Sequence, residues 1–119
     1  MLFIVSGRDH DNGLEHRLEV RPLHRAHYEA LGEDLILSGP YLDAKGDPIG
    51  SMIIIRRDSQ AAAEAHAAAD PFVTEKVFSS VTVSRWDWFM NRPEGFESDS
   101  GRGPIPATYP RGRRWPKAG

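Results

Sequence analysis

The chain has 119 residues, of which 39% are hydrophobic and 27% charged, and this size and composition fit one compact domain. No apolar run approaches the roughly 20 residues needed to cross a bilayer, and the N-terminal stretch has no basic leader, so we expect neither a membrane protein nor a signal peptide. The absence of cysteine excludes disulfides, thiolate catalysis and cysteine-ligated zinc. We therefore expect a cytoplasmic domain that is poor in cofactors.

The net charge of −2 hides an asymmetry between two segments. Residues 1–89 carry 9 Lys+Arg and 14 Asp+Glu, whereas residues 90–119 carry 6 Lys+Arg and 3 Asp+Glu, with five of the nine prolines and five of the eleven glycines. We expect an acidic domain over 1–89 and a basic, Pro/Gly-rich C-terminal extension over 90–119. Residues 111–117 mix basic side chains with a tryptophan, as nucleic-acid-binding arms do, but the acidic domain argues against a nucleic-acid partner.

Hydrophobic patterning predicts four strands and two helices. Gly7 is expected to end the first strand, and the first helix is expected to begin at Arg21–Pro22 because proline suits the first helical turn, with Leu23 in its apolar stripe. Gly39–Pro40 is expected in turn structure. The predicted elements are a strand over 2–5, a helix from 21 to about 31, strands over 35–37 and 49–55, an alanine-rich helix over 61–69 and a strand over 77–88.

The order β-α-β-β-α-β predicts an α+β, ferredoxin-like fold. Right-handed crossovers place both helices on one face of a four-stranded antiparallel sheet. The apolar side chains of the strands then need a layer on the other face, which a second copy of the chain would supply, so we expect a homodimer. The strand residues behind this expectation include Phe3, Val5, Ile53, Ile55, Val81 and Val83.

This topology makes His24 and Asp70 neighbours although they are far apart in sequence. In the first turn of a helix, the positive end of the dipole would disfavour a protonated His24, and a neutral imidazole can act as a general base. Asp70 would fix the tautomer of His24. Alternatively, His24 is an ordinary helix-surface histidine, and Asp70 caps a short helical turn that begins at Pro71.

Other polar residues near this pair have competing interpretations. Tyr28 borders the face of His24 but is also typical of a half-buried core tyrosine. His66 is either a second polar group of the site or a solvated helix residue. A metal held by His24, His27, His66 and Asp70 is conceivable, but no HExxH-like motif supports it, and we expect no metal.

Four stretches of residues 1–89 resemble the YciI-like (YCII-related) family. They are Arg17-Leu18-x-Val20-Arg21-Pro22-x-His24, Ser38-Gly39-Pro40, Gly50-Ser51 and Ala67-x-Ala69-Asp70-Pro71-Phe72, the last followed by Val77-Phe78. The resemblance implies a ferredoxin-like fold that assembles as a dimeric α/β barrel, with His24 and Asp70 as a His–Asp pair at a pocket. One branch of the family resembles lyases that remove chloride from a chlorinated hydroxyhydroquinone without a metal or organic cofactor.

We therefore expect a small cofactor-independent enzyme of the lyase or proton-transfer type. His24 would take a proton from a small substrate, Asp70 would orient His24, and backbone amides near Gly39 and Ser51 would stabilise negative charge. The alternative is a non-catalytic dimeric module that binds or senses a small ligand in the same pocket. The residues expected to bind the ligand are Arg21, Tyr28, Gly39, Pro40, Ser51 and His66.

Overall fold

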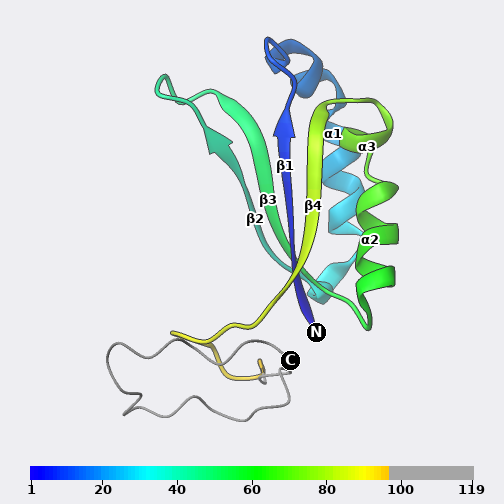
Figure 1. Ribbon diagram of the computed structural model, residues 1–119, viewed down its shortest axis with the longest axis vertical. Coiled ribbons are helices and arrows are strands. Elements are labelled where there is room, and N and C mark those ends of the chain that lie inside the picture. The colour runs from blue at the N-terminus through cyan, green and yellow to red at the C-terminus, as the bar shows by residue number, and fades with distance from the viewer. Residues whose placement is uncertain (97–119) are drawn as a thin grey trace. The chain divides into compact units, whose positions relative to one another are not determined.

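In the computed structural model, which describes residues 1–96, four strands form one antiparallel sheet in the order β2-β3-β1-β4. The helices all lie on one face of it (Figure 1). This is the ferredoxin-like arrangement predicted from the sequence, with two short helical turns, η1 and α3, in addition. The elements are β1 (Leu2–Asp9), α1 (Leu14–Glu29), η1 (Gly32–Asp34), β2 (Leu35–Leu42), β3 (Pro48–Arg56), α2 (Gln60–Ala68), α3 (Pro71–Thr74) and β4 (Phe78–Trp86).

The chain divides into two units, Met1–Trp86 and Asp87–Gly119. The first unit holds all the helices and strands of the described residues. In the second, the Trp88 indole N–H donates to the carbonyl oxygen of Met90 at 2.9 Å, and most of the basic extension expected over 90–119 lies outside the described residues. No helix within residues 1–96 is both long and apolar enough to cross a membrane.

Two strands are longer than predicted, because the glycine and proline residues that were expected to end them or to form turns lie inside them. β1 continues through Gly7 to Asp9, and a Cβ at Gly7 would come within 2.5 to 2.6 Å of the Phe78 ring, so glycine is needed for close packing and not for a turn. β2 includes Gly39 and Pro40. Proline is tolerated there because β2 is an edge strand, with no partner on one side.

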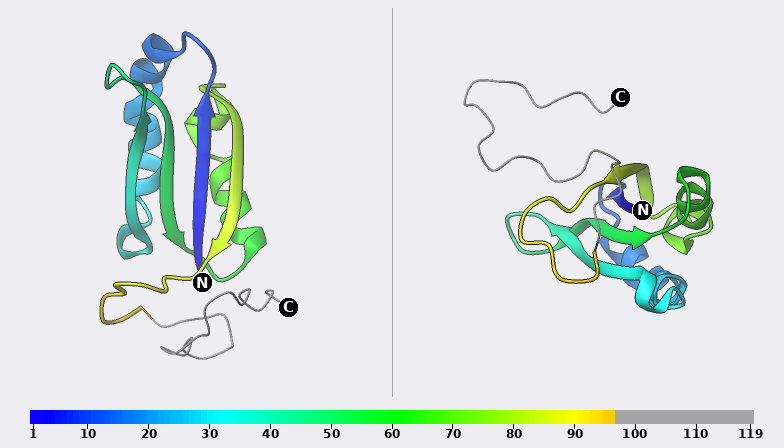
Figure 2. Two further views of the ribbon diagram at one scale, coloured as in Figure 1. Left: turned by 60° about the vertical axis from the view of Figure 1, so that its left-hand side comes forward. Right: turned by 90° about the horizontal axis from the view of Figure 1, so that it is seen from below.

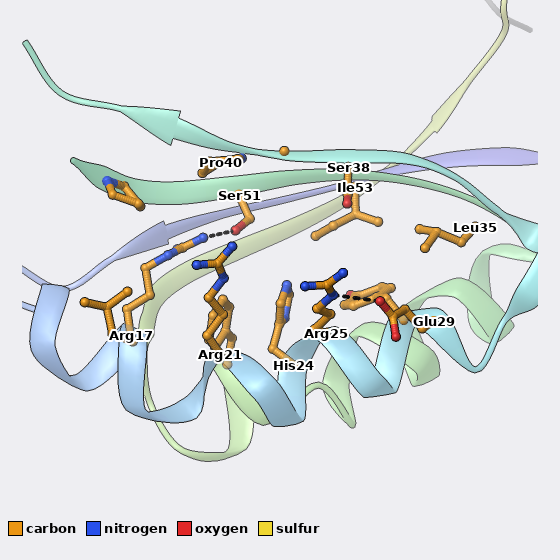
Figure 3. Close-up of a pocket in the computed structure, with 15 residues that line it drawn as sticks. Arg17, Arg21, His24, Arg25, Glu29, Leu35, Ser38, Pro40, Ser51 and Ile53 are labelled. Carbon is orange, nitrogen blue, oxygen red and sulfur yellow. Dashed lines mark hydrogen bonds and ion pairs between the residues drawn. The ribbon is translucent and has the colours of Figure 1, made fainter. Parts of the chain in front are cut away.

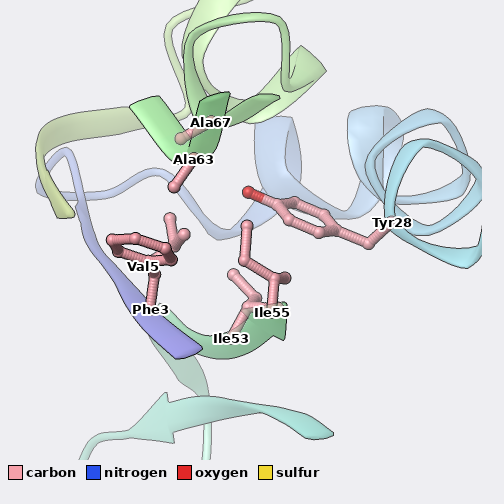
Figure 4. Close-up of a cluster of buried hydrophobic side chains, with 7 residues drawn as sticks. All are labelled: Phe3, Val5, Tyr28, Ile53, Ile55, Ala63 and Ala67. Carbon is pink, nitrogen blue, oxygen red and sulfur yellow. The ribbon is translucent and has the colours of Figure 1, made fainter. Parts of the chain in front are cut away.

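The core lies between the sheet and the helices. Phe3 and Val5 of β1 pair in register with Ile55 and Ile53 of β3, so these four side chains share a face. They pack against Ala63 and Ala67 of α2 and against Tyr28 (Figure 4). Val83 is partly buried against this cluster. For Phe3, Val5, Ile53 and Ile55 the expected need for a second layer is therefore wrong, because the helices of the same chain already cover them, whereas Val81 is 37% exposed.

Alternation along the strands places a different set of apolar side chains on the opposite face. Ile4 pairs with Ile54, and Ile54 in turn pairs with Leu37 of β2, whose side chain is on this face and 40% exposed. Within the described residues of Met1–Trp86, no helix covers this face, which the left view of Figure 2 shows. The accessible apolar residues of the uncovered face are Ile4, Leu37 and Met52, whereas Leu2 and Ile54 on the same face are only 7% and 4% exposed.

Helix α1 begins seven residues earlier than predicted, at Leu14, so Pro22 lies inside it. Pro22 lacks the N–H that would bond the carbonyl of Leu18, and both residues are exposed, where solvent can satisfy that carbonyl. The predicted apolar stripe is also wrong, since Leu23 is 61% exposed. The face that α1 buries carries Arg17, Val20 and Tyr28.

The alanine-rich segment forms α2, and a second cap follows it directly. The Ser59 hydroxyl accepts a hydrogen bond from the backbone N–H of Ala62 at 3.1 Å and caps the helix. Asp70 then caps α3, with Pro71 in the first helical position. The small side chains of Ala63 and Ala67 are fully buried and let α2 pack closely on the sheet.

Candidate functional site

A cleft of about 450 Å³ opens between α1 and the strands β2 and β3, on the helix-covered side of the sheet (Figure 3). This volume falls in the range of small-molecule pockets. Side chains of α1 form one wall and residues of β2 and β3 the other. The lining residues are Arg17, Leu18, Arg21, His24, Arg25, Tyr28, Glu29, Leu35, Ser38, Gly39, Pro40, Pro48, Ser51, Ile53 and Phe72.

His24 and Asp70 meet at the base of this cleft, 46 positions apart in sequence. The distance from His24 Nδ1 to Asp70 Oδ1 is 2.7 Å, and the side chains are 13% and 0% exposed. Because a carboxylate only accepts hydrogen bonds, Nδ1 is the donor. In the neutral imidazole the proton is therefore on Nδ1, and Nε2 is left with a free lone pair on the ring that lines the cleft.

The helix dipole, which was expected to disfavour a protonated His24, does not act strongly at this position. His24 lies in the third turn of α1, because the helix begins at Leu14, and the dipole acts mainly within the first and last turns. The prediction that the helix N-terminus keeps His24 neutral is therefore wrong. The predicted proximity of His24 and Asp70 is found.

Asp70 has two roles at once. Its Oδ1 accepts both from His24 Nδ1 and from the backbone N–H of Phe72, the latter at 2.9 Å. The second bond is the cap of α3, so the two interpretations of Asp70 are compatible. The same carboxylate oxygen fixes the start of α3 and the orientation of the His24 ring.

Phe72, which the sequence reasoning did not include in the site, forms the other support of His24. The two rings are stacked with centroids 3.8 Å apart and planes 10° from parallel. The Arg17 guanidinium carbon lies 4.8 Å from the centroid of the same Phe72 ring. His24 is thus held by a hydrogen bond at one edge and by an aromatic ring against its plane.

Arg17 is a second residue that the sequence reasoning left out of the site. It is 5% exposed and forms two hydrogen bonds to Asp9, at 3.0 and 3.1 Å, and a third to the Ser51 hydroxyl at 2.6 Å. It connects α1 to β1 and β3 at one end of the cleft. Arg17 lies seven residues, or about two helical turns, before His24, so both side chains are on one face of α1. This spacing could have indicated from the sequence that Arg17 belongs to the site.

The cleft contains five of the six predicted ligand-binding residues. Arg21, Gly39, Pro40 and Ser51 line it, and Tyr28 contributes as well. The Tyr28 hydroxyl points toward Ala63 and Ala67 of α2, so its ring is the part available to the cleft (Figure 4). Burial, with a smaller effect of the Asp70 charge, raises the pKa of Tyr28 well above its usual value, so this hydroxyl stays protonated.

His66 does not line the cleft. Its ring stacks on that of His27 with centroids 4.0 Å apart, and the His27 Nε2–H donates to the His66 carbonyl oxygen at 2.8 Å. Burial, followed by the nearby charges of His27 and Arg57, lowers the pKa of His66. Within residues 1–96, no three His, Cys, Asp or Glu side chains are arranged to hold a metal ion.

The expected backbone donors near Ser51 are a less suitable source of positive charge than the arginines. Ser51 belongs to β3, which pairs with β1 on one side and β2 on the other, so its backbone N–H is directed into the sheet. The groups that face the cleft with positive charge are instead guanidinium groups of α1 (Figure 3).

The sequence model of the YCII-related domain matches residues 1–87. Protein YciI of Escherichia coli O6:H1 (strain CFT073) is 37% identical over 92 residues, covering 70% of this chain and 93% of that protein, and Protein YciI of Shigella flexneri has the same values. Among solved structures, 5-chloro-2-hydroxyhydroquinone dehydrochlorinase (TftG) from Burkholderia phenoliruptrix AC1100, in complex with 2,5-dihydroxybenzoquinone, superposes with a TM-score of 0.69. It is 28% identical, and the match covers 73% of this chain and 94% of that chain.

Proposed function

The chain belongs to the family of YCII-related domains, and from this premise we propose that it is a small-molecule enzyme of the lyase or proton-transfer type that works without a metal or organic cofactor. The observation that carries the proposal is the 2.7 Å contact between His24 Nδ1 and Asp70 Oδ1 at the base of a cleft. The similarity to a dehydrochlorinase crystallised with 2,5-dihydroxybenzoquinone supports a small ring compound as the substrate.

In the proposed reaction His24 is the general base. Its Nε2 takes a proton from a hydroxyl or carbon of the substrate, and the electron pair left behind expels a leaving group, such as chloride, as an anion. The buried Asp70 carboxylate stabilises the imidazolium that forms, and the proton then passes to solvent. The net change is loss of an acid HX, so no oxidant or reductant is consumed.

We further propose that two copies assemble as a dimeric α/β barrel through the uncovered face of the sheet. The supporting observation is the apolar part of that face, which includes Ile4, Leu37 and Met52. The cleft lies on the opposite side of the same sheet, between α1 and strands β2 and β3. The proposed dimer therefore leaves the helix-covered side of each sheet, and the cleft with it, outside the sheet-to-sheet contact.

The test is turnover of 5-chloro-2-hydroxyhydroquinone, followed by chloride release, in three variants. His24→Gln removes the base, and Asp70→Asn keeps an oxygen that can cap α3 while losing the negative charge. We expect kcat to fall about 100-fold or more in each, the usual contribution of a positioned acid–base group. His10→Gln removes an exposed histidine outside the cleft and is expected to keep wild-type turnover.

Two results would contradict this function. One is a His24→Gln variant that retains full turnover. The other is a wild-type protein whose melting temperature rises with the ring compound while time-resolved mass spectrometry of a metabolite mixture detects no product, which would instead support the non-catalytic binding module.

A further inference from the structure

Four nitrogen-bearing side chains of α1 line one wall of the cleft in a row. Arg17, Arg21, His24 and Arg25 follow one another at spacings of four, three and one residue, and in Figure 3 they point from the helix toward β2 and β3. Glu29 is the acidic member of the lining. This wall of the cleft is therefore rich in positive charge although residues 1–89 as a whole are acidic.

Two of the three arginines already have carboxylate partners. Arg17 binds both oxygens of Asp9 and is buried, so its charge is balanced within the protein. Arg25 donates from Nε to Glu29 at 2.7 Å. The Arg17 guanidinium is thus committed inside the protein, and the charge of the exposed Arg25 is balanced by Glu29 next to it.

Arg21 differs from both. Within the described residues it makes no hydrogen bond or ion pair with another side chain, and it is exposed while lining the cleft. Asp70 cannot serve as its partner from inside the cleft, because that carboxylate is completely buried behind His24 and bonded to it. One positive charge of the cleft wall is thus left without a partner in residues 1–96, one helical turn before the proposed base.

The rest of the lining suits a flat, apolar body. Phe72, Tyr28 and Ile53 border the floor of the cleft and are almost fully buried. Leu18, Leu35 and Pro40 supply accessible apolar surface on its walls. A ring that packs between these walls would have one end near Arg21 and a neighbouring position near His24 Nε2. Guanidinium recognises planar oxyanions by paired hydrogen bonds, which a neutral substituent cannot reproduce.

We propose that the cleft selects small ring compounds that carry an anionic oxygen group, a carboxylate or a phenolate, and that Arg21 is the residue that determines this specificity. This inference rests on the proposed function for its site but concerns the charge of the ligand, not the proton transfer. Arg21 holds the anionic end, the apolar walls hold the ring, and the group that reacts is brought to His24.

The experiment measures binding by titration calorimetry with two probes of nearly equal shape, 2,5-dihydroxybenzoate and its neutral amide, 2,5-dihydroxybenzamide. We expect the wild-type protein to bind the benzoate at least tenfold more tightly, the lower range for a hydrogen bond to a charged group. Arg21→Gln should weaken benzoate binding at least tenfold and change amide binding less than twofold. Arg21→Lys should restore part of the preference, because it keeps the charge but loses the planar fork.

A charge control separates a local contact from the overall field of the protein. Lys45→Gln removes one positive charge from the exposed turn between β2 and β3 and should leave both affinities unchanged. Equal binding of benzoate and amide by the wild-type protein, binding of neither, or equal loss of both in Arg21→Gln would each overturn the inference. If chloride release still depends on His24 in that case, the proposed function stands and only the ligand class is refuted.

Discussion

Asp70 shows how one buried oxygen connects the fold with the site. Its Oδ1 accepts from both His24 and the start of α3, whereas Oδ2 is buried with no hydrogen-bond partner in the described residues. Two donors on one oxygen hold the carboxylate in a fixed position relative to His24. Helix capping thus fixes the carboxylate that orients one edge of the His24 ring, while the stacked Phe72 ring supports its plane.

His66 is expected to make the stability of the protein depend on pH. The pKa of His66 is lower in the folded state than its ordinary value of about 6.5. When the pH falls below about 6.5, the unfolded chain therefore binds the proton more readily than the folded one. The contribution of His66 to stability is therefore present above about pH 6.5 and is lost as the pH falls below it. Thermal melts between pH 7 and pH 5 should show a shallower decline for His66→Gln than for the wild type, and an equal or steeper decline would contradict this.

At the scale of elements, the sequence predicts correctly those features that depend only on neighbouring residues, such as helix caps. Asp70 was recognised as a candidate cap because an N-cap depends on a side chain and the next two or three backbone N–H groups. The start of α1 was missed because Pro22 looks like a first-turn residue. Its exposure, which makes an interior proline tolerable, depends on tertiary packing that the sequence does not display.

Pro22 is expected to lower the stability of α1. It removes one backbone hydrogen bond, and an interior proline costs up to about 3 kcal/mol relative to alanine. Because Pro22 lies on the exposed side of α1, Pro22→Ala should remove this cost without changing the cleft. We expect a rise of about 1–3 kcal/mol in the free energy of unfolding, measured by urea denaturation. A decrease would show that the proline is needed for the native path of the helix.

At the scale of the molecule, the element order was enough to predict the fold and the meeting of His24 with Asp70. The element order does not tell which of the alternating side chains of each strand face the helices. Phe3 and Val5 alternate with Leu2 and Ile4, all apolar, so the pattern did not reveal which pair faces the helices. Packing against small residues of α2 decides that point, and a shift of one residue would reverse it.

The proposed dimer makes a prediction at this scale. Met52→Glu places a charge in the apolar part of the uncovered face, where desolvation in a sheet-to-sheet contact would be costly. We expect light scattering after size exclusion to give twice the monomer mass for the wild type and the monomer mass for this variant. Leu23→Glu, which adds the same charge to an exposed residue of α1, should remain dimeric.

A wild-type protein that is monomeric at micromolar concentration would refute the dimer, and so would a Met52→Glu variant that keeps the doubled mass. Either result would leave the proposed proton transfer intact, because His24 and Asp70 come from the same chain.

Because Gly7 of β1 has no side chain, the aromatic residues that support His24 can pack closely on the sheet. Gly7 gives the Phe78 ring room against β1; Phe78 meets Phe72 edge to face with centroids 5.3 Å apart, and Phe72 in turn lies flat on His24. A single methyl group at position 7 would push on the first ring of this series and so tilt the imidazole away from its carboxylate. The alignment of the proton acceptor thus depends on a glycine of the central strand that does not itself line the cleft.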